Sequence, residues 1–189
     1  MRNLLLVLAA CHSNTAATTP DAAAVSVAGH WKSDCTPNGQ GGAISLDFTN
    51  TADHWSVAYV TYGDASCTTP VVTANIAGTY TIGAASSIVS GAYDAVFSFD
   101  TKTLTPNVQA LADTLNGMGC GTFTVGQPTD VYTNGCPGFG MYPKVTCTAD
   151  YDLVSITGTT LRFGNRPADN NMCSADKRPT ALGLALSRY

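Results

Sequence analysis

The clearest covalent chemistry in this sequence involves a cysteine near its start. The stretch LAAC at 8–11 matches a bacterial lipobox, in which a branched apolar residue and two small residues precede a cysteine. Small residues are needed there because the groove of the signal peptidase is narrow, and the cysteine thiol accepts the diacylglycerol. We therefore expect a lipoprotein signal peptide over residues 1–10 and a lipid attached to Cys11. An ordinary secretory signal that happens to contain a cysteine is the alternative.

The residues after Cys11 indicate where such a lipid would hold the protein. Residues 13–24 are almost entirely Ala, Thr, Ser, Asn and Pro, a composition typical of flexible linkers, so we expect a lipidated tether over residues 11–27. In diderm bacteria an Asp directly after the cysteine tends to retain a lipoprotein in the inner membrane, and here that residue is His12. The expected location is therefore the bacterial cell envelope, lipid-anchored at the outer membrane.

Six further cysteines follow, and an even number in an exported domain is typical of disulfides. They are Cys35, Cys67, Cys120, Cys136, Cys147 and Cys173. Many connectivities are open, but the order along the chain favours pairing neighbours: the first with the second, the third with the fourth, the fifth with the sixth. The alternative is a metal site. No CxxC pair is present, and His30 and His54 each lie beside a Trp with no cysteine at ligand spacing, so we expect no metal.

Residues that could carry catalysis are few. The sequence has neither a G-x-S-x-G nucleophile elbow nor a glycine-rich phosphate loop. His30 and His54 could act as bases. Asp150 and Asp152 are two apart, which places them on the same face of a strand, and paired carboxylates can do acid–base work. We expect this pair on an outward polar face, and we expect no enzyme, no catalytic residue and no cofactor.

Composition excludes other classes of partner. Of the 189 residues only 12% are charged, the net charge is −4, and Lys and Arg form no basic run. Nucleic acids and anionic lipid surfaces need clustered positive charge, so we expect neither as a partner. The sequence identifies no protein partner. The length suits a single domain with a substantial core, which we expect over residues 28–189.

The elements that must position these residues are mostly strands. Apolar and polar residues alternate in many short runs, which indicates an antiparallel barrel or sandwich. The expected strands are 43–50, 54–63, 71–82, 93–100, 144–156, 159–164 and 181–187. One stretch has helical spacing instead, and there we expect a short helix with Thr105 as its N-cap, Pro106 in its first turn and Gly117 at its end. The Gly- and Pro-rich stretches 124–143 and 165–179 are expected loops.

Two ends of the expected sheet carry a known signature. Gly29 and Trp31 form a Gly-x-Trp motif at the first β region, and Arg188 directly follows the last. This combination resembles the calycin (lipocalin-like) family, in which the Arg packs across the Trp and closes one end of the barrel. The resemblance implies the same role for Trp31 and Arg188, with a cation–π contact between them.

A wider resemblance runs from Gly29 to Arg188. The chain is similar to the domain named for being down-regulated by adenomatosis polyposis coli, through GHWKSDC, VTYGDASCTTP, YDLVSITGTTLRFG and RPTALGLALSR. It departs from that pattern at Ala185-Leu186, where the family tends to have Pro-Leu. Animal members are membrane proteins that oppose Wnt signalling and contain lipid-binding, lipocalin-like barrels. The resemblance implies a barrel with an apolar cavity, and it does not extend to Wnt inhibition.

The alternation of the expected strands selects the residues that would face such a cavity. They are Leu46, Phe48, Trp55, Val57, Tyr59, Phe97, Phe99, Tyr151, Leu153 and Phe163. A small barrel can fill itself with such side chains or hold one apolar ligand. The expected function is a membrane-anchored lipoprotein that binds a lipid or acyl chain. The alternative is an envelope structural or protein-interaction lipoprotein, with a filled barrel and binding loops at 124–143 and 165–179.

Overall fold

The computed structural model describes residues 25–189. The expected signal peptide, Cys11 and the tether up to residue 24 lie outside this range. Val27, in the last part of the expected tether, is fully buried, and its carbonyl accepts hydrogen bonds from Trp31 Nε1 at 2.8 Å and Asn50 Nδ2 at 3.3 Å. The folded region therefore begins before residue 28. Within the described range no helix has the length and apolar character needed to cross a membrane.

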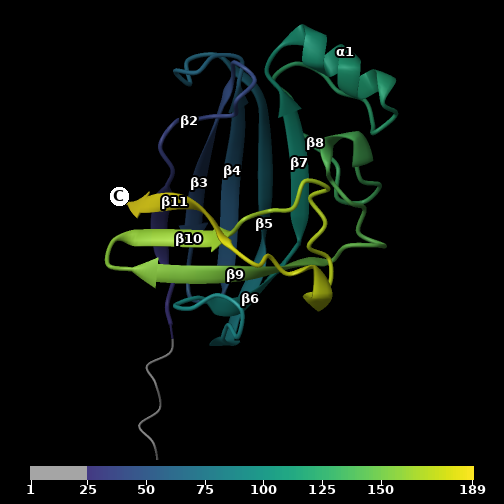
Figure 1. Cartoon of the computed structure of the whole chain (residues 1–189). Helices are drawn as coiled ribbons and strands as arrows, with labels where there is room; N and C mark the ends of the chain where they lie inside the picture. Colours follow the sequence, from purple (N-terminus) through teal and green to yellow (C-terminus); the bar gives the residue numbers. More distant parts are fainter. Residues whose placement is uncertain (1–24) are drawn as a thin grey trace, which may run out of the picture.

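The described chain is mostly antiparallel β-sheet with one short α-helix, as expected (Figure 1). The strands are β1 (Gly29–Lys32), β2 (Thr36–Pro37), β3 (Ala43–Asn50), β4 (His54–Tyr62), β5 (Pro70–Ala85), β6 (Tyr93–Ser98), β7 (Thr101–Pro106), β8 (Thr129–Asp130), β9 (Ala149–Thr157), β10 (Thr160–Gly164) and β11 (Leu182–Arg188). The helix is α1 (Gln109–Gly117), and two 3-10 turns are η1 (Pro137–Phe139) and η2 (Ala175–Lys177).

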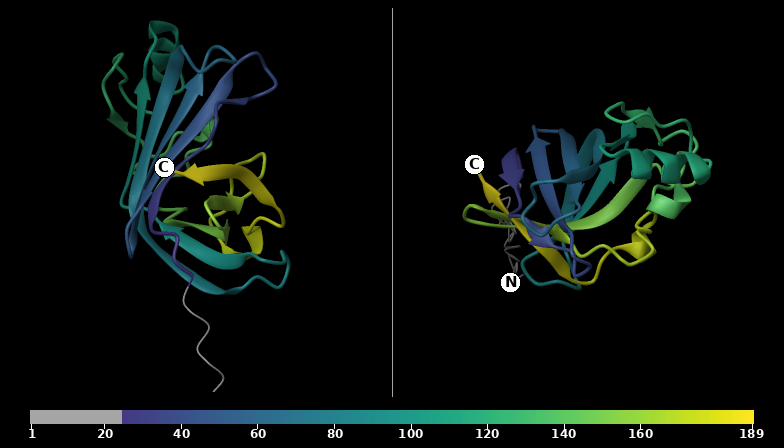
Figure 2. Two further views of the ribbon diagram at one scale, coloured as in Figure 1. Left: turned by 90° about the vertical axis from the view of Figure 1, so that its left-hand side faces the viewer. Right: turned by 90° about the horizontal axis from the view of Figure 1, so that it is seen from above.

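Eight strands close into a barrel. The order β3-β4-β5-β6-β9-β10-β11-β1 runs through antiparallel neighbours, and β1 pairs with β3 to complete the ring. Strands β9, β10 and β11 cross in front of β3, β4 and β5 (Figure 1). From the side, the blue strands β3 and β4 form one wall, and the green and yellow strands β9, β10 and β11 lie opposite them (Figure 2). The expected lipocalin-like barrel is confirmed.

The barrel forks along β5, its longest strand. Residues 72–77 pair with β7, whereas residues 80–85 pair with β6. Gly78 lies between the two halves, and a Cβ there would be 1.9 Å from the Ser98 carbonyl oxygen. The close approach of the Ser98 backbone therefore requires glycine at this position. Beyond the fork, β7 carries β8 outside the ring of eight strands.

The fork explains where the sequence prediction of the helix was wrong. Thr105 and Pro106, expected to start the helix, are the last residues of β7 and pair with Thr73 and Val72 of β5. The helix begins three residues later than expected, at Gln109 with Val108 as its N-cap, and the left-handed residue after it is Gly119 rather than Gly117. The local capping signal was outweighed because residues 101–106 complete the long β5 strand with backbone hydrogen bonds and bury alternate side chains.

Other strand boundaries differ from expectation as well, and β5 extends to Ala85 rather than residue 82. The strand expected over 93–100 ends at Ser98, and a tight turn leads directly into β7. The strand expected from residue 144 begins at Ala149, since residues 144–148 form a turn in which Thr146 and Cys147 donate backbone hydrogen bonds to Pro143. The expected loops 124–143 and 165–179 are irregular apart from β8 and the turns η1 and η2.

Three disulfides join the pairs that the order of cysteines favoured. They are Cys35–Cys67, Cys120–Cys136 and Cys147–Cys173. The first links the segment before β2 to the β4–β5 loop, the second links the end of α1 to the loop after β8, and the third links the segment before β9 to the loop 165–179. Each bridge thus holds an irregular segment rather than two strands of the sheet.

The buried side chains form two clusters. The larger lies inside the barrel and includes Trp31, Trp55, Phe97 and Leu161. The smaller lies where α1 packs beside β7, around Leu104 and Leu115, so the helix covers the part of the sheet beyond the fork.

Candidate functional site

A cavity of about 540 Å³ lies inside the barrel. Its apolar wall is built around four aromatic rings from four different strands. The Phe163 ring centre lies 4.4 Å from that of Phe48 and 5.4 Å from that of Phe97, and the Trp55 and Phe97 ring centres are 5.2 Å apart. These side chains converge because each occupies an inward position of its strand. The result is a continuous aromatic surface beside an open space.

Most of the positions expected to face the interior do line this cavity. They are Leu46, Phe48, Trp55, Val57, Tyr59, Phe97, Phe99 and Phe163. Antiparallel pairing keeps opposite residues on the same face of the sheet. The inward residues of β3, β4 and β6 therefore belong to one continuous lining of the cavity, through the pairings β3–β4, β4–β5 and β5–β6.

Strand β9 has the opposite orientation to the expected one. Tyr151 and Leu153 do not line the cavity, whereas Asp150 and Asp152, expected on an outward polar face, do. The register decides this, because Asp150 pairs with the inward-facing Phe97.

The outer face of β9 is buried under the loop 165–179, which explains its apolar residues. Tyr151 N donates a hydrogen bond to the carbonyl of the fully buried Met172 at 2.7 Å. The Arg178 guanidinium lies 5.8 Å from the Tyr151 ring centre and donates to the backbone carbonyls of Ala95 and Asp152. Leu153 is fully buried as well. Tyr151 and Leu153 therefore face the side that the loop covers, whereas Asp150 and Asp152 face the cavity.

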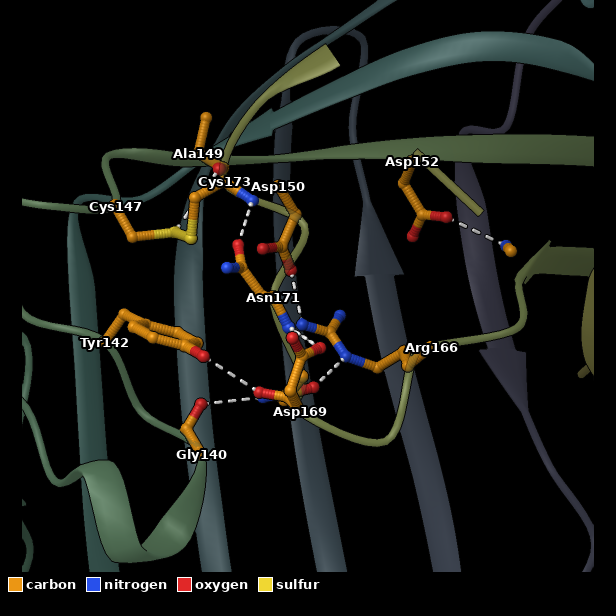
Figure 3. A network of polar contacts seen from close by, with 12 residues as sticks. Gly140, Tyr142, Cys147, Ala149, Asp150, Asp152, Arg166, Asp169, Asn171 and Cys173 are labelled. Atoms are coloured by element: carbon orange, nitrogen blue, oxygen red, sulfur yellow. Dashed lines mark hydrogen bonds and ion pairs between the residues drawn. A yellow bond between two sulfur atoms is a disulfide. The ribbon is translucent and has the colours of Figure 1, made fainter. Parts of the chain in front are cut away.

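A polar network closes around one side of the cavity (Figure 3). Arg166 Nη2 lies 2.7 Å from Asp150 Oδ2, and the Asp150 side chain is only 8% exposed. Asn170 accepts a hydrogen bond from Arg166 Nε and donates one to the Gly140 carbonyl at 2.8 Å. The Tyr142 hydroxyl donates to the Asp169 carbonyl at 3.0 Å. These contacts tie the segments 139–142 and 165–170 together, and both segments contribute to the cavity wall.

The second carboxylate is bound by backbone amides. Asp152 Oδ1 accepts hydrogen bonds from Leu153 N at 2.7 Å and Gly164 N at 2.9 Å. Burial raises the pKa of Asp152 to about 7, because desolvation outweighs the nearby Arg166 charge and the two amides. A Cβ at residue 164 would lie 2.4 Å from Asp152 Oδ1, so glycine there leaves room for the carboxylate.

Lys102, like Arg166, is a charged residue of the cavity that the sequence did not reveal. It is 4% exposed, and its ammonium lies 3.5 Å from the Phe99 ring centre and 5.5 Å from that of Tyr132. Burial lowers the pKa of Lys102 to about 8, although the Asp150 charge opposes this. The available signal was spacing, because Lys102, Leu104 and Pro106 are two residues apart and lie on the same buried face of β7. Residues 101–106 were not expected to form a strand, so this spacing was not recognised.

A comparison with known protein families identifies the family of this chain. The sequence model of the family described as "Adenomatosis polyposis coli down-regulated 1" matches residues 11–134, which is more than half of the chain. The chain belongs to this family. The match ends shortly after β8, so the strands β9 to β11 and the loop 165–179 lie beyond it. No curated protein sequence matches the chain.

In this member of the adenomatosis polyposis coli down-regulated 1 family, an Arg–Trp pair lies at the closure of the barrel. Trp31 of β1 pairs with Arg188 of β11, and the guanidinium carbon lies 5.3 Å from the fully buried Trp31 ring. Arg188 Nη2 also donates to the Ala28 carbonyl at 2.9 Å. Gly29 has a φ of 141°, and a Cβ there would lie 2.9 Å from Arg188 Nη2. The Gly-x-Trp motif therefore makes space for the arginine that covers the Trp.

The remaining candidates for chemistry lie elsewhere or are chemically blocked. His30 Nδ1 lies 3.2 Å from Thr49 Oγ1 and His54 Nδ1 lies 2.7 Å from Asp53 Oδ1; both histidines are exposed, and neither lines the cavity. Potential ligand atoms of Cys147, Asp150 and Cys173 lie within 4.8 Å of one another. However, the two cysteines are joined in a disulfide and offer no thiolate for a metal.

Proposed function

We propose that this protein binds one apolar ligand, such as a lipid or an acyl chain, in the cavity of its barrel. The observation that carries the proposal is the cavity of about 540 Å³ beside Trp55 and Phe97. This volume falls within the ~300–1,000 Å³ typical of small-molecule sites. Leu46, Ile76 and Phe163 line the cavity and are only partly buried, so apolar surface remains for a ligand to cover. Covering it contributes about 25 cal/mol per Å².

We infer binding rather than catalysis from the state of the acidic groups. Asp150 is paired with Arg166, and Asp152 is held by two backbone amides. A general base needs a free lone pair directed at a substrate proton. Arg166 engages Asp150 Oδ2 and the two amides engage Asp152 Oδ1, which suits a role of these carboxylates in shaping the polar side of the cavity.

A titration of the delipidated full-length protein with a fluorescent fatty acid tests the proposal. We expect saturable binding, and lipid detectable by mass spectrometry in protein purified without delipidation. Filling the cavity by Leu46→Trp should weaken binding about tenfold or more while the protein remains folded, because the larger side chain occupies the ligand's space. Intrinsic fluorescence and thermal unfolding check that the variant is folded.

The matched control is Val60→Trp. Val60 is on β4 and partly buried, but it faces away from the cavity, so this variant should bind like the wild type. Absence of saturable binding together with absence of co-purified lipid would count decisively against the proposal. Equal loss in both variants would show that the effect of Leu46→Trp is not due to the cavity.

We also propose that Cys11 carries a lipid that anchors the barrel to the outer membrane of a bacterial cell envelope. The support is the LAAC stretch at 8–11, the linker composition of 13–24 and His12 after the cysteine. A diacylglycerol and an amide-linked acyl chain would anchor firmly, since each buried CH₂ contributes about 0.8 kcal/mol.

The Cys11→Ser variant tests the anchor. It should lose the acyl groups and move from the membrane fraction to the soluble fraction, as measured by detergent phase partitioning and intact mass. Ser13→Ala leaves the LAAC stretch intact and should partition like the wild type. A Cys11→Ser protein that still partitions with membranes would contradict the proposed anchor.

A further inference from the structure

We propose that the ligand of the cavity is a long-chain carboxylate and that the Lys102 ammonium binds its anionic head group. This inference rests on the proposed function, because it specifies the ligand of the same cavity. It depends on three observations. Lys102 has no counter-ion among the described residues, the nearby carboxylates have other partners, and a row of aromatic rings leads away from Lys102.

Lys102 is a buried cation that lacks a counter-ion. It lines the cavity and is 4% exposed. Within residues 25–189, its ammonium makes no hydrogen bond or ion pair with another side chain; its recorded neighbours are the faces of the Phe99 and Tyr132 rings. A ring face offsets part of the cost of burying the charge, but an ammonium has three N–H groups that need acceptors. The open side of the cavity is where an acceptor can enter.

The acidic side chains of the wall are already engaged. The charged groups of the described cavity wall are Lys102, Arg166, Asp150 and Asp152. Arg166 pairs with Asp150 at 2.7 Å, and Asp152 accepts two backbone amides. Neither carboxylate lies within ion-pair distance of the Lys102 ammonium. Lys102 is therefore the cation of the described cavity wall that has no carboxylate partner, which favours an incoming anion with a singly charged head group over a doubly charged phosphate monoester.

An apolar path begins at the same ammonium. The Phe99 ring beneath Lys102 lies 6.1 Å from the Trp55 ring, which contacts Phe97 at 5.2 Å, and Phe163 lies beyond at 5.4 Å from Phe97. A ligand with its head group at Lys102 can thus lay a hydrocarbon chain along this row of rings. A carboxylate at the end of a single chain matches one cation followed by one continuous apolar surface.

Titrations of the delipidated full-length protein with palmitate and with 1-hexadecanol test the head group. The two probes share a sixteen-carbon chain, and Trp55 in the cavity wall provides a fluorescence signal. Wild-type protein should bind palmitate about tenfold or more tightly than the alcohol, since a charge-assisted hydrogen bond contributes at least that factor. Lys102→Met should weaken palmitate binding about tenfold and leave hexadecanol within about twofold. The control Lys177→Met, at an exposed lysine of η2, should change neither affinity.

The outcomes separate this inference from the proposed function. Equal affinity of the wild type for the two probes, or equal weakening of both by Lys102→Met, would overturn the assignment of a carboxylate head group while leaving the apolar cavity as the binding site. Failure of both probes to bind would overturn the inference and the proposed function together. The comparison of two probes on wild-type protein does not depend on the stability of any variant.

Discussion

At the scale of single residues, the cavity holds its polar groups in three different ways. Asp150 forms an ion pair with Arg166, Asp152 accepts two backbone amides, and Lys102 lies against aromatic rings. The surroundings of Asp152 oppose ionisation, because the carboxyl is deeply buried and desolvation is the largest effect on its pKa. Its charge state should therefore be visible in the stability of the protein.

Replacing Asp152 by Asn should change how stability depends on pH. In the unfolded chain the carboxyl ionises near 3.8, whereas burial raises its pKa to about 7 in the folded protein. Between pH 4 and 7 the unfolded state releases this proton and the folded state retains it, so the free energy of unfolding falls as pH rises and levels off above 7. Asn cannot ionise, so Asp152→Asn should gain up to about 4 kcal/mol relative to the wild type between pH 3.5 and 8. Urea unfolding across this range measures the difference.

Asp64 provides a control of opposite sign. Desolvation raises its pKa, but hydrogen bonds from the backbone N–H groups of Thr68, Thr69 and Ser66 together outweigh this and lower it to about 2. Its stabilising effect is present above pH 4 and disappears as pH falls through about 2, so Asp64→Asn should be less stable than the wild type at neutral pH. A flat difference between Asp152→Asn and the wild type across pH 4–7 would contradict the assigned burial of Asp152.

At the scale of elements, the fork of β5 brings Lys102 of β7 to the cavity. Strand β5 pairs with β7 before Gly78 and with β6 after it. Strand β7 therefore lies next to the part of β5 that lines the cavity, and its Lys102 reaches the cavity wall. The fork also lets α1 cover the diverging strands with its own small core. Any change that prevents the close approach at Gly78 should affect the whole barrel.

Gly78→Ala should destabilise the protein by about 2 kcal/mol or more. The added Cβ would lie 1.9 Å from a backbone carbonyl, which cannot rotate away as a side chain can. Chemical unfolding of purified protein measures this loss. Gly117→Ala is the matched control, because its Cβ meets no atom within 4 Å at the end of α1, and it should be neutral or stabilising by up to about 1 kcal/mol. A Gly78→Ala variant as stable as Gly117→Ala would contradict the described geometry.

At the scale of the whole molecule, the disulfides hold the parts that the sheet does not. The loop 165–179 covers the outer face of β9, supplies Arg178 to that face and continues to the network around Arg166. Cys147–Cys173 attaches this loop to the start of β9. The bridge therefore affects both the stability of the fold and the wall of the cavity.

Removing Cys147–Cys173 as a double Ala variant should reduce both stability and binding. A sequence separation of 26 corresponds to about 3.5 kcal/mol in the chain-entropy model, measurable by urea unfolding. The affinity for the fluorescent fatty acid should also fall, since the loop that orients Arg166 is released. Removing Cys35–Cys67, with a separation of 32, should cost a similar free energy of about 3.7 kcal/mol but leave the affinity unchanged, because the segments around these two cysteines do not line the cavity. Equal effects on affinity would contradict the distinction, and non-reducing peptide mapping verifies the pairs.

Some of the candidate site could be predicted because it depends on local patterns. Strands β3 and β4 alternate clearly, so Phe48 and Trp55 were assigned to the interior from sequence alone. Strand β9 was assigned wrongly, because both of its faces are buried and Tyr151 and Leu153 lie on the face covered by the loop 165–179. Lys102 was missed since a Thr-rich segment with one Lys, next to a helix signal, carries little indication of a buried strand.

The sequence by itself determined the class of fold, the pairs of cysteines favoured by their order and the family resemblance. These depend on alternation, spacing and motifs that are read along the chain. Only the tertiary structure decided which face of β9 is inside, where β5 changes partner and why Lys102 lacks a counter-ion. Each of these depends on residues far apart in sequence, since the burial of a side chain is set by what packs on both sides of its strand.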